Sequence, residues 1–457
     1  MGNILSSFSF SSNRPVSSLS SVIQHICGPT TKSSSRKRKA SFNDNASDIE
    51  AKRFKLNNSD FVYQKFFVEG VDSNVQIHAL GHTWRLHKIY LEQCGYFHAL
   101  FHGKWSDSEK NEHHLTFRDD NICFTGLNNV FASLYNNEIE IDEDNIASIC
   151  GAASLLNLTS VLEICEIHLA GYLYNKEKLL ICLRLADRYG FDKRMKEAIN
   201  VLKYMFCQFC LDETFLRGLQ QSWLIKLFSQ QFVCVRENEL DLYNAIKNWI
   251  FLTECPYARL GDEKAIALFY ESSDFDWHKY FGLLRLLRVS HLVSLQSSLK
   301  LIRNDGIIPT SLLNRVVCDQ WQMLLRSEET TTGFPEIIDD DEFYSSCYRF
   351  GRVGVSAYSR TSWRWLGYFF GVDLLVNYDY GKKWFNGSNT TSNFSKIRRY
   401  NEITLQNVEL GKFKLPPKGQ LVSIHLFCLP FAPIHRPTFY WDEFESSTGL
   451  QTDRSVY

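Results

Sequence analysis

Residues whose types could take part in chemistry are scattered along this chain and do not form a recognisable catalytic motif. Cys207-Gln-Phe-Cys210 has the spacing of a metal-binding or redox pair, but no second pair lies near it and the surrounding run is apolar. Core packing is therefore favoured over metal or redox use. His113-His114 has no partner either and is predicted to lie in a solvated loop. The chain lacks a GxxxxGKS/T phosphate loop and a GxSxG nucleophile motif, so the sequence favours a non-enzyme without a cofactor or metal.

Bulk composition limits the class of protein further. The 13 cysteines are an odd number without regular spacing, which indicates reduced thiols in cytosol or nucleus. The net charge of -1 gives no overall attraction to nucleic acid, so no direct nucleic-acid partner is expected. The longest apolar run, residues 421–434, contains His425 and two prolines and is predicted to form a buried strand and turn rather than a membrane span.

Binding signals stand out in residues 1–56, a serine-rich arm without hydrophobic periodicity that is predicted to be disordered. The arm carries nine Lys and Arg against three Asp and Glu. The basic residues form two clusters with the spacing of a bipartite nuclear localisation signal, namely Arg36, Lys37, Arg38 and Lys39, then Lys52, Arg53 and Lys55. A solubilising tail and a patch that binds anionic lipid are the alternatives.

The first residues of the arm also fit a lipidation pattern. Met1-Gly2-Asn3-Ile4-Leu5-Ser6 matches the motif for myristoylation of Gly2, although so short a match also arises by chance. One acyl chain binds a membrane only marginally, so stable membrane contact would need a second signal.

The elements after the arm alternate between strand and helix patterns. Val75 to Leu80 alternates apolar and polar residues, and Gly81-His82 predicts a turn into a second strand from Thr83. Residues 84–107 predict a helical hairpin with its break at Gly95. Further predictions are listed in chain order: a segment at Leu115 to Phe117, a helix through Val130 to Tyr135, a strand at Glu138 to Ile141, and a helix pair through Ile149 and Leu155 to Cys165.

This order, with the phrases His87-Lys-Ile-Tyr-Leu91 and Leu134-Tyr-Asn-Asn-Glu-Ile139, resembles a BTB (POZ) domain, which we assign to residues 57–170. BTB domains usually carry Asp at the position of Asn74. Residues 171–330 show helical periodicity and, in Ala186-Asp-Arg-Tyr-Gly190, resemble a BACK domain. Period-two segments at Trp363 to Leu366, 371–376 and 420–427 predict a β-rich domain over residues 331–457, after an acidic linker at 339–342. The expected fold class is a multidomain α+β chain.

Three regions together resemble the germ cell-less (GCL) family. They are the basic arm, the BTB-like sequence motifs together with Gly103-Lys-Trp105, and the segment Trp363-Arg-Trp-Leu-Gly-Tyr-Phe-Phe-Gly-Val-Asp-Leu-Leu-Val376. The resemblance implies a homodimeric substrate adaptor of a cullin-3 RING ubiquitin ligase, associated with the nuclear envelope and its proteins. Some family members act in germ-cell formation. The alternative is a nuclear scaffold or transcriptional co-regulator that dimerises through its BTB domain and does not bind a cullin.

The resemblance also assigns binding residues. Trp105 and Asp107 occupy the place of the hydrophobic residue and Glu with which BTB adaptors bind the cullin, and Tyr135 and Asn137 would line the same surface. The BACK segment from Leu179 to Tyr189 would add a second cullin surface. The alternative for Trp105 is closure of the BTB core.

Two more binding surfaces are predicted, one for dimerisation and one for a substrate. By analogy with related domains, the segment Tyr63 to Phe67 and the Ile89 face are expected to form a two-fold dimer interface. In the C-terminal domain, Trp363, Arg364 and Trp365 are candidate residues for binding an unknown protein substrate, because aromatics and Arg dominate binding hot spots. Core packing is the alternative for these alternating aromatics.

Overall fold

The computed structural model describes residues 58–230, 233–272, 275–293, 295–329, 347–353, 361–369, 372–378, 397–398, 402–403, 421–426 and 441. The predicted arm and the acidic linker lie outside the described residues. The chain divides into two compact units between Ala198 and Ile199, within helix α9.

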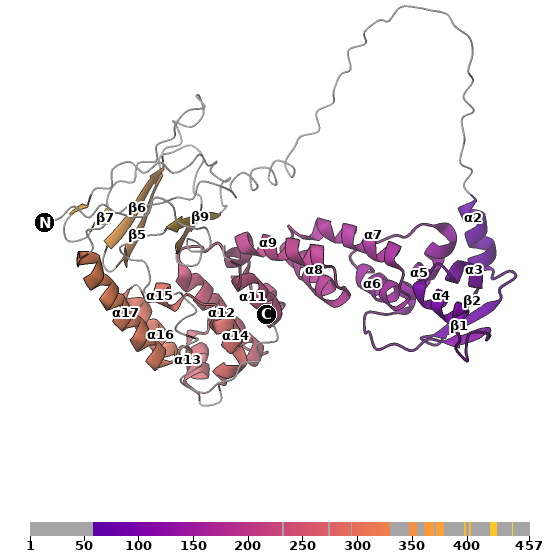
Figure 1. The fold of residues 1–457 in the computed structure, drawn as a ribbon, viewed down its shortest axis with the longest axis horizontal. Helices are drawn as coiled ribbons and strands as arrows, with labels where there is room; N and C mark the ends of the chain where they lie inside the picture. The colour runs from indigo at the N-terminus through magenta and orange to yellow at the C-terminus, as the bar shows by residue number, and fades with distance from the viewer. Residues whose placement is uncertain are drawn as a thin grey trace, which may run out of the picture. The chain divides into compact units, whose positions relative to one another are not determined.

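The first unit, residues 58–198 of the described chain, contains a small sheet and a succession of helices (Figure 1). The predicted boundary at residue 170 falls inside this unit. Its elements are α2 (Ser59–Val62), the π-helix η1 (Tyr63–Val68), β1 (Val75–Ala79), β2 (His82–Leu86), α3 (Lys88–Leu91), α4 (Gly95–His102), β3 (Glu112–His114), α5 (Phe124–Asn136), α6 (Ile146–Leu155), α7 (Thr159–Leu169), the 3-10 helix η2 (Ala170–Tyr172), α8 (Lys176–Tyr189) and the start of α9 (Asp192–Phe209).

The sheet has the order β2-β1-β3, with β1 antiparallel to β2 and parallel to β3. The predicted strand pair of β1 and β2 is confirmed as a β-hairpin, but its turn is one residue earlier than expected. Leu80 (φ 51°) and Gly81 (φ 77°) form the turn, and both positive φ values suit the twist of a two-residue hairpin. His82 is therefore the first residue of β2.

Helices α5 and α6 form the core of this unit. The buried face of α5 has the 3.6-residue spacing that the sequence shows, at Leu127, Val130, Phe131 and Leu134. The helices approach closely at Gly126, where an added Cβ would lie 2.5 Å from the carbonyl oxygen of Ser148. Glycine at this position therefore allows the α5–α6 packing.

Two local predictions are wrong. Glu138 to Ile141 is not a strand, although its alternating residues have strand spacing. His113 and His114 lie in β3 rather than in a solvated loop, and His113 is buried. The short strand also ends at His114, before the predicted Leu115 to Phe117 segment. β3 forms because it pairs with β1, more than 30 positions earlier in the chain, which local periodicity does not show.

Helix α8 is fixed to the first unit by a polar cluster. The Tyr189 hydroxyl donates to Asp119 at 2.9 Å and accepts from the Asn121 amide at 2.8 Å, while Arg188 pairs with Asp119 at 2.7 Å. At the other end, the Asn175 side chain accepts hydrogen bonds from the first backbone N–H groups of the helix. The predicted second cullin surface from Leu179 to Tyr189 is thus part of the same compact unit as the sheet.

The second unit begins with helices, as the 3.6-residue periodicity predicts. They are the end of α9, α10 (Glu213–Arg217), α11 (Gln221–Phe228), α12 (Glu239–Glu254), α13 (Glu263–Glu271), η3 (Trp277–Tyr280), α14 (Phe281–Leu284), α15 (Val289–Leu292), α16 (Gln296–Asp305) and α17 (Thr310–Glu329). Helix α12 is joined to the end of α16 by two polar contacts. The Tyr243 hydroxyl donates to Asp305 at 2.9 Å, and Lys247 pairs with the same carboxylate at 2.7 Å. Cys207 and Cys210 are both buried, so their predicted core packing is confirmed.

Strands follow the helices, which agrees with the predicted change to period two. The described strands are β4 (Tyr348–Val353), β5 (Thr361–Phe369), β6 (Val372–Tyr378), β7 (Ile397–Arg398), β8 (Glu402–Ile403) and β9 (Leu421–Leu426). β4 pairs with β9, and the other four form a sheet in the order β5-β6-β7-β8. β9 supports the predicted strand at the start of the longest apolar run. No described helix is long and apolar enough to cross a bilayer.

A buried ion pair joins β4 to helix α12. Arg349 donates through Nε to the Glu239 carboxylate at 2.7 Å and through Nη2 to its second oxygen, and both side chains are at most 3% exposed. The Gly351 N–H also donates to the Glu237 carbonyl at 3.1 Å. A side chain at Gly351 would overlap the Val235 backbone, so this strand can approach the helical region only with glycine there.

Candidate functional site

The loop between α4 and β3 presents the most distinctive exposed residue of the first unit. Helix α4 ends at His102, and the Gly103 N–H donates to the Ala99 carbonyl at 3.0 Å. A Cβ at Gly103 would lie 2.6 Å from the Ala99 oxygen and would overlap the Trp105 indole. The absence of a side chain at Gly103 therefore lets the indole lie against the end of the helix.

Trp105 is 68% exposed, so it does not close the BTB core, and that alternative is wrong. Its backbone N–H donates to the Ser108 hydroxyl oxygen at 3.2 Å, and that hydroxyl donates to the Gly103 carbonyl at 2.8 Å. Ser108 thus closes the loop beneath the indole. A large aromatic side chain that is exposed to solvent on a hydrogen-bonded loop has the properties of a binding hot spot.

Asp107 follows Trp105 by two residues and is also exposed. Lys110 pairs with its carboxylate across one turn of the loop. The hydrogen bond and the positive charge of Lys110 hold the pKa of the Asp107 carboxyl below its ordinary value. The loop therefore presents an ionised carboxylate beside an exposed indole.

The loop is anchored on both sides by the fold. The Lys88 ammonium lies 5.3 Å from the centre of the Phe101 ring, and that ring lies 5.8 Å from the imidazole of His113. His113 is buried in β3 and contacts the Lys110 carbonyl through Nε2 at 3.1 Å. Burial lowers the pKa of His113, with the positive charge of Lys88 acting in the same direction.

Tyr135 differs from the expectation that it lines the cullin surface, because its side chain is only 4% exposed. Its hydroxyl accepts from the His87 backbone N–H at 3.0 Å and lies 3.2 Å from Nδ1 of the same residue. His87 Nε2 donates to the Val71 carbonyl at 2.8 Å. This network makes Tyr135 a packing and positioning residue rather than a contact residue. Asn137, by contrast, is exposed at the end of α5 and has a left-handed conformation (φ 57°).

The predicted dimer surface includes a strongly exposed apolar residue. Ile89 on α3 is 73% exposed, and Phe61 on α2 is 63% exposed. Tyr63 and Phe67 stack on each other with ring centres 5.4 Å apart, and Phe67 lies at the same distance from Tyr135. Tyr63 and Phe67 of the predicted segment are therefore partly covered. Phe61, which precedes that segment by two residues, is more accessible.

Asn74, where BTB domains usually have Asp, keeps a structural role. Its side-chain oxygen accepts a hydrogen bond from the Lys88 backbone N–H at 2.8 Å, at the start of α3. An amide oxygen accepts this bond as a carboxylate would. The substitution therefore preserves the local contact that positions α3.

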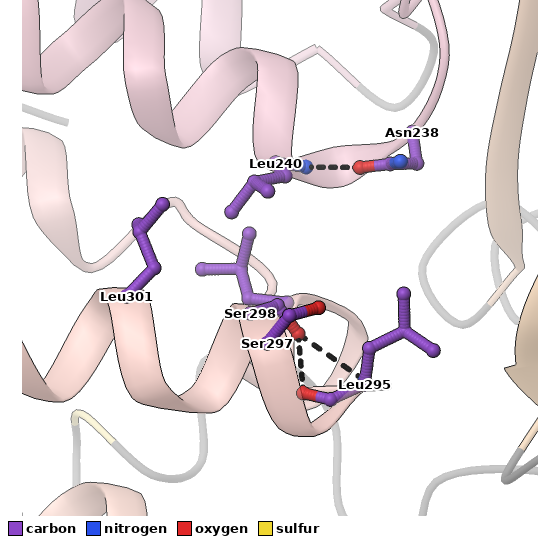
Figure 2. A pocket seen from close by; sticks show the side chains of 7 residues that line it. Asn238, Leu240, Leu295, Ser297, Ser298 and Leu301 are labelled. Atoms are coloured by element: carbon purple, nitrogen blue, oxygen red, sulfur yellow. Dashed lines mark hydrogen bonds between the residues drawn. The ribbon is translucent and has the colours of Figure 1, made fainter.

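A pocket in the second unit lies between the start of α12 and helix α16 (Figure 2). It encloses about 120 Å³ and is lined mainly by leucines, including Leu240, Leu295 and Leu301. The nearby Asn238 and Ser298 side chains cap helix ends: Asn238 accepts from the Leu240 N–H at 2.8 Å, and Ser298 accepts from the Leu295 N–H at 3.2 Å. The lining is mainly apolar, with the exposed Ser297 among its polar members.

The remaining candidate residues are only partly described. Trp363, Arg364 and Trp365 lie on β5, where they pair with Val376, Leu375 and Leu374 of β6. Their role in binding a substrate stays a prediction. Gly2 and the two basic clusters lie outside the described residues. Within the part of the chain that the structure describes, no group of three His, Cys, Asp or Glu side chains could hold a metal ion.

Sequence reasoning missed the residues that shape the loop. Gly103 and Ser108 hold Trp105 in place, and Lys110 pairs with Asp107. The three-residue spacing of Asp107 and Lys110 was an available signal for an ion pair. The hydrogen bond from Ser108 to Gly103 had no comparable signal, since it depends on the path of the loop.

The fold and sequence of the first unit define a class of protein. The BTB/POZ domain family matches residues 63–173. This range contains the sheet, the α4–β3 loop and helices α5 to α7, so the chain is a BTB-domain protein. Over 182 residues the chain is 28% identical to Kelch-like protein 17 of Mus musculus. This alignment covers 40% of the chain and 27% of the relative.

More extensive similarity connects the chain with germ cell-less proteins. It is 30% identical over 334 residues to Germ cell-less protein-like 1 of Homo sapiens, covering 70% of this chain and 64% of the relative. It is 27% identical over 364 residues to Protein germ cell-less of Drosophila melanogaster, covering 71% and 63%. The chain thus spans slightly less than two thirds of the length of these relatives. It belongs to the germ cell-less family of BTB proteins.

Proposed function

We propose that this chain is a substrate-specific adaptor of a cullin-3 RING ubiquitin ligase. In this role the α4–β3 loop binds the cullin through Trp105 and Asp107, and the C-terminal β-rich region recruits a protein substrate. The observation that carries the proposal is the exposed indole of Trp105, held on an ordered loop two residues before an ionised carboxylate. BTB membership and similarity to a Kelch-like protein support it.

The contribution of such an adaptor is proximity. A substrate held beside a charged ubiquitin-conjugating enzyme presents its lysine at a high effective concentration, without any catalytic group on the adaptor. The hydrogen bond from Tyr189 to Asp119 suits this role, because it joins α8 to the compact unit that also carries the loop. Asp107 has one methylene fewer than the Glu usual in BTB adaptors, so its reach is shorter but its charge is the same.

Co-elution tests the proposed function. The full chain mixed with the N-terminal domain of cullin-3 should elute from a sizing column as a complex, earlier than either protein alone. Separate elution at micromolar concentrations would favour the second candidate, a BTB-dimerising nuclear scaffold or transcriptional co-regulator. The exposed Ile89 and Phe61 favour that candidate equally, because dimerisation does not require a cullin.

Both candidates lead to a prediction for Ile89. We expect the full chain to be a two-fold dimer, and Ile89→Asp should make it a monomer because the change places two carboxylates at a buried apolar interface. Multi-angle light scattering measures the mass directly. Ile167→Asp is the matched control, since Ile167 on α7 is 70% exposed and should leave the dimer intact. A monomeric wild-type chain would contradict the dimer.

The proposed location is the nucleus, at the nuclear envelope. If the two basic clusters of the arm form one import signal, changing Lys52, Arg53 and Lys55 to Ala should leave the protein in the cytoplasm, because each cluster supplies part of the charge that the import receptor binds. Gly2→Ala should only release the membrane-bound fraction of the protein from membranes and should leave nuclear import unchanged. Fluorescence microscopy of tagged chains measures both effects. Unchanged nuclear signal in the triple variant would argue against the import signal.

A further inference from the structure

Two serines in the α4–β3 loop differ in accessibility. The Ser108 hydroxyl is half-buried and fully engaged, since it donates to the Gly103 carbonyl at 2.8 Å and accepts from the Trp105 N–H at 3.2 Å. Ser106 is exposed, and its hydroxyl has a contact to Asp107 of 3.5 Å, at the long limit for a hydrogen bond. Ser106 therefore offers a nucleophilic oxygen to an enzyme, and its modification affects only this one long contact to Asp107.

Three carboxylates and one ammonium, that of Lys110, follow Ser106 within six residues. Asp107, Glu109 and Glu112 follow it at the first, third and sixth positions, and all three are exposed. Protein kinases select substrates partly by such charge patterns. Ser160 also precedes a glutamate by three residues, but it lies in the first turn of α7, where the backbone is committed to helical hydrogen bonds. The loop around Ser106 can adapt to a kinase cleft at a smaller conformational cost.

We propose that Ser106 is a phosphorylation site for an acid-directed protein kinase, and that its phosphate switches off the binding loop formed by Trp105 and Asp107. The regulatory part rests on the proposed cullin-binding function. In the reaction, Ser106 Oγ attacks the γ-phosphorus of ATP, an Oγ–P bond forms and the bond from that phosphorus to the ADP oxygen breaks. The serine proton passes to the catalytic aspartate of the kinase, and ADP leaves.

The phosphate would act through charge and solvation. From Gly103 to Glu112 the loop has two lysines against three carboxylates, a net charge of -1. A phosphate adds about two negative charges at the residue that separates Trp105 from Asp107 in the chain. Trp105 could then enter an apolar groove only if the dianion beside it were desolvated, and the phosphate would compete with Asp107 for Lys110. We expect cullin binding to weaken about tenfold or more.

The test uses the full chain, ATP and purified casein kinase 2 as the acid-directed kinase. Peptide mass spectrometry should locate a phosphate on Ser106 and none on Ser108 or Ser160. Other serines before acidic residues, such as Ser47, are also possible substrates. The Ser106→Ala chain treated in the same way therefore controls for their phosphates. Titration with the cullin-3 N-terminal domain then compares treated and untreated chains.

The supporting result is a phosphate on Ser106 with at least tenfold weaker cullin binding, while treatment leaves the affinity of Ser106→Ala unchanged. Phosphates elsewhere but none on Ser106 would overturn the modification site. Full phosphorylation of Ser106 with unchanged affinity would overturn its regulatory role. Absence of cullin binding by the untreated chain is a failure of the proposed function instead, and the occupancy of Ser106 then still supports or overturns the modification site by itself.

Discussion

Trp105→Ala should weaken binding of the cullin-3 N-terminal domain by about 2 kcal/mol or more, the cost typical of truncating a hot-spot aromatic. The indole is 68% exposed in the free chain, so its contact surface is available to a partner. The same exposure means that the substitution removes little from the folded core. Isothermal titration calorimetry with the full chain measures the loss of affinity.

Leu268→Ala provides a matched control for Trp105→Ala. Leu268 on α13 of the second unit is 67% exposed, so the two substitutions remove apolar side chains of equal accessibility. The control should bind cullin-3 as the wild type does, and both variants should keep the wild-type unfolding temperature. Equal affinities for Trp105→Ala and wild type would remove Trp105 from the binding site.

Glu239→Gln should lower the free energy of unfolding of the second unit by about 3–5 kcal/mol, as expected when one partner of a buried ion pair is lost. The change leaves the Arg349 guanidinium buried without its carboxylate. Burial alone would lower the pKa of Arg349, and Glu239 raises it above the ordinary value. Arg288, also buried, donates to the Cys347 carbonyl at 2.7 Å, so a second positive charge lies close by and adds to the cost.

Urea denaturation followed by tryptophan fluorescence measures this loss. Lys279→Met is the control, because Lys279 pairs with Glu254 on the surface, at 56% side-chain exposure, and its loss should cost less than about 1 kcal/mol. Because β4 contacts α12 through this pair, the Glu239 variant should also increase hydrogen exchange at Tyr348 to Gly351. A variant as stable as the wild type would show that the ion pair contributes little to the contact between β4 and α12.

Local patterns predicted several of the described elements. The helical run Val130 to Tyr135 identified α5, and the alternation from Val75 identified β1. The same alternation in Glu138 to Ile141 gave a wrong strand. Alternation shows that a segment can form a strand, but a strand also needs a neighbour for its backbone hydrogen bonds. The turn at Leu80 was missed because leucine rarely adopts a positive φ.

The candidate site was predictable in identity but not in geometry. The family resemblance selected Trp105 and Asp107, and both are exposed on one loop. It also selected Tyr135, whose hydroxyl is directed at His87 in the interior. A helical pattern does not specify which face of α5 the N-terminal η1 covers, and Phe67 of η1 lies against Tyr135. Pairings far apart in sequence, such as Glu239 with Arg349, also left no local signal.

Substitution at Asp107 tests the adaptor function most directly, since it changes the charge and reach of one exposed side chain. Calorimetric titration of the cullin-3 N-terminal domain into full chains should show binding by the wild type. Asp107→Glu, which restores the residue usual in BTB adaptors, should bind at least as tightly, because the longer carboxylate keeps its charge-assisted hydrogen bonds. Asp107→Lys should bind more weakly while staying folded. If the wild type shows no binding and Asp107→Glu gains none, the chain is not a cullin-3 adaptor and the scaffold function takes its place.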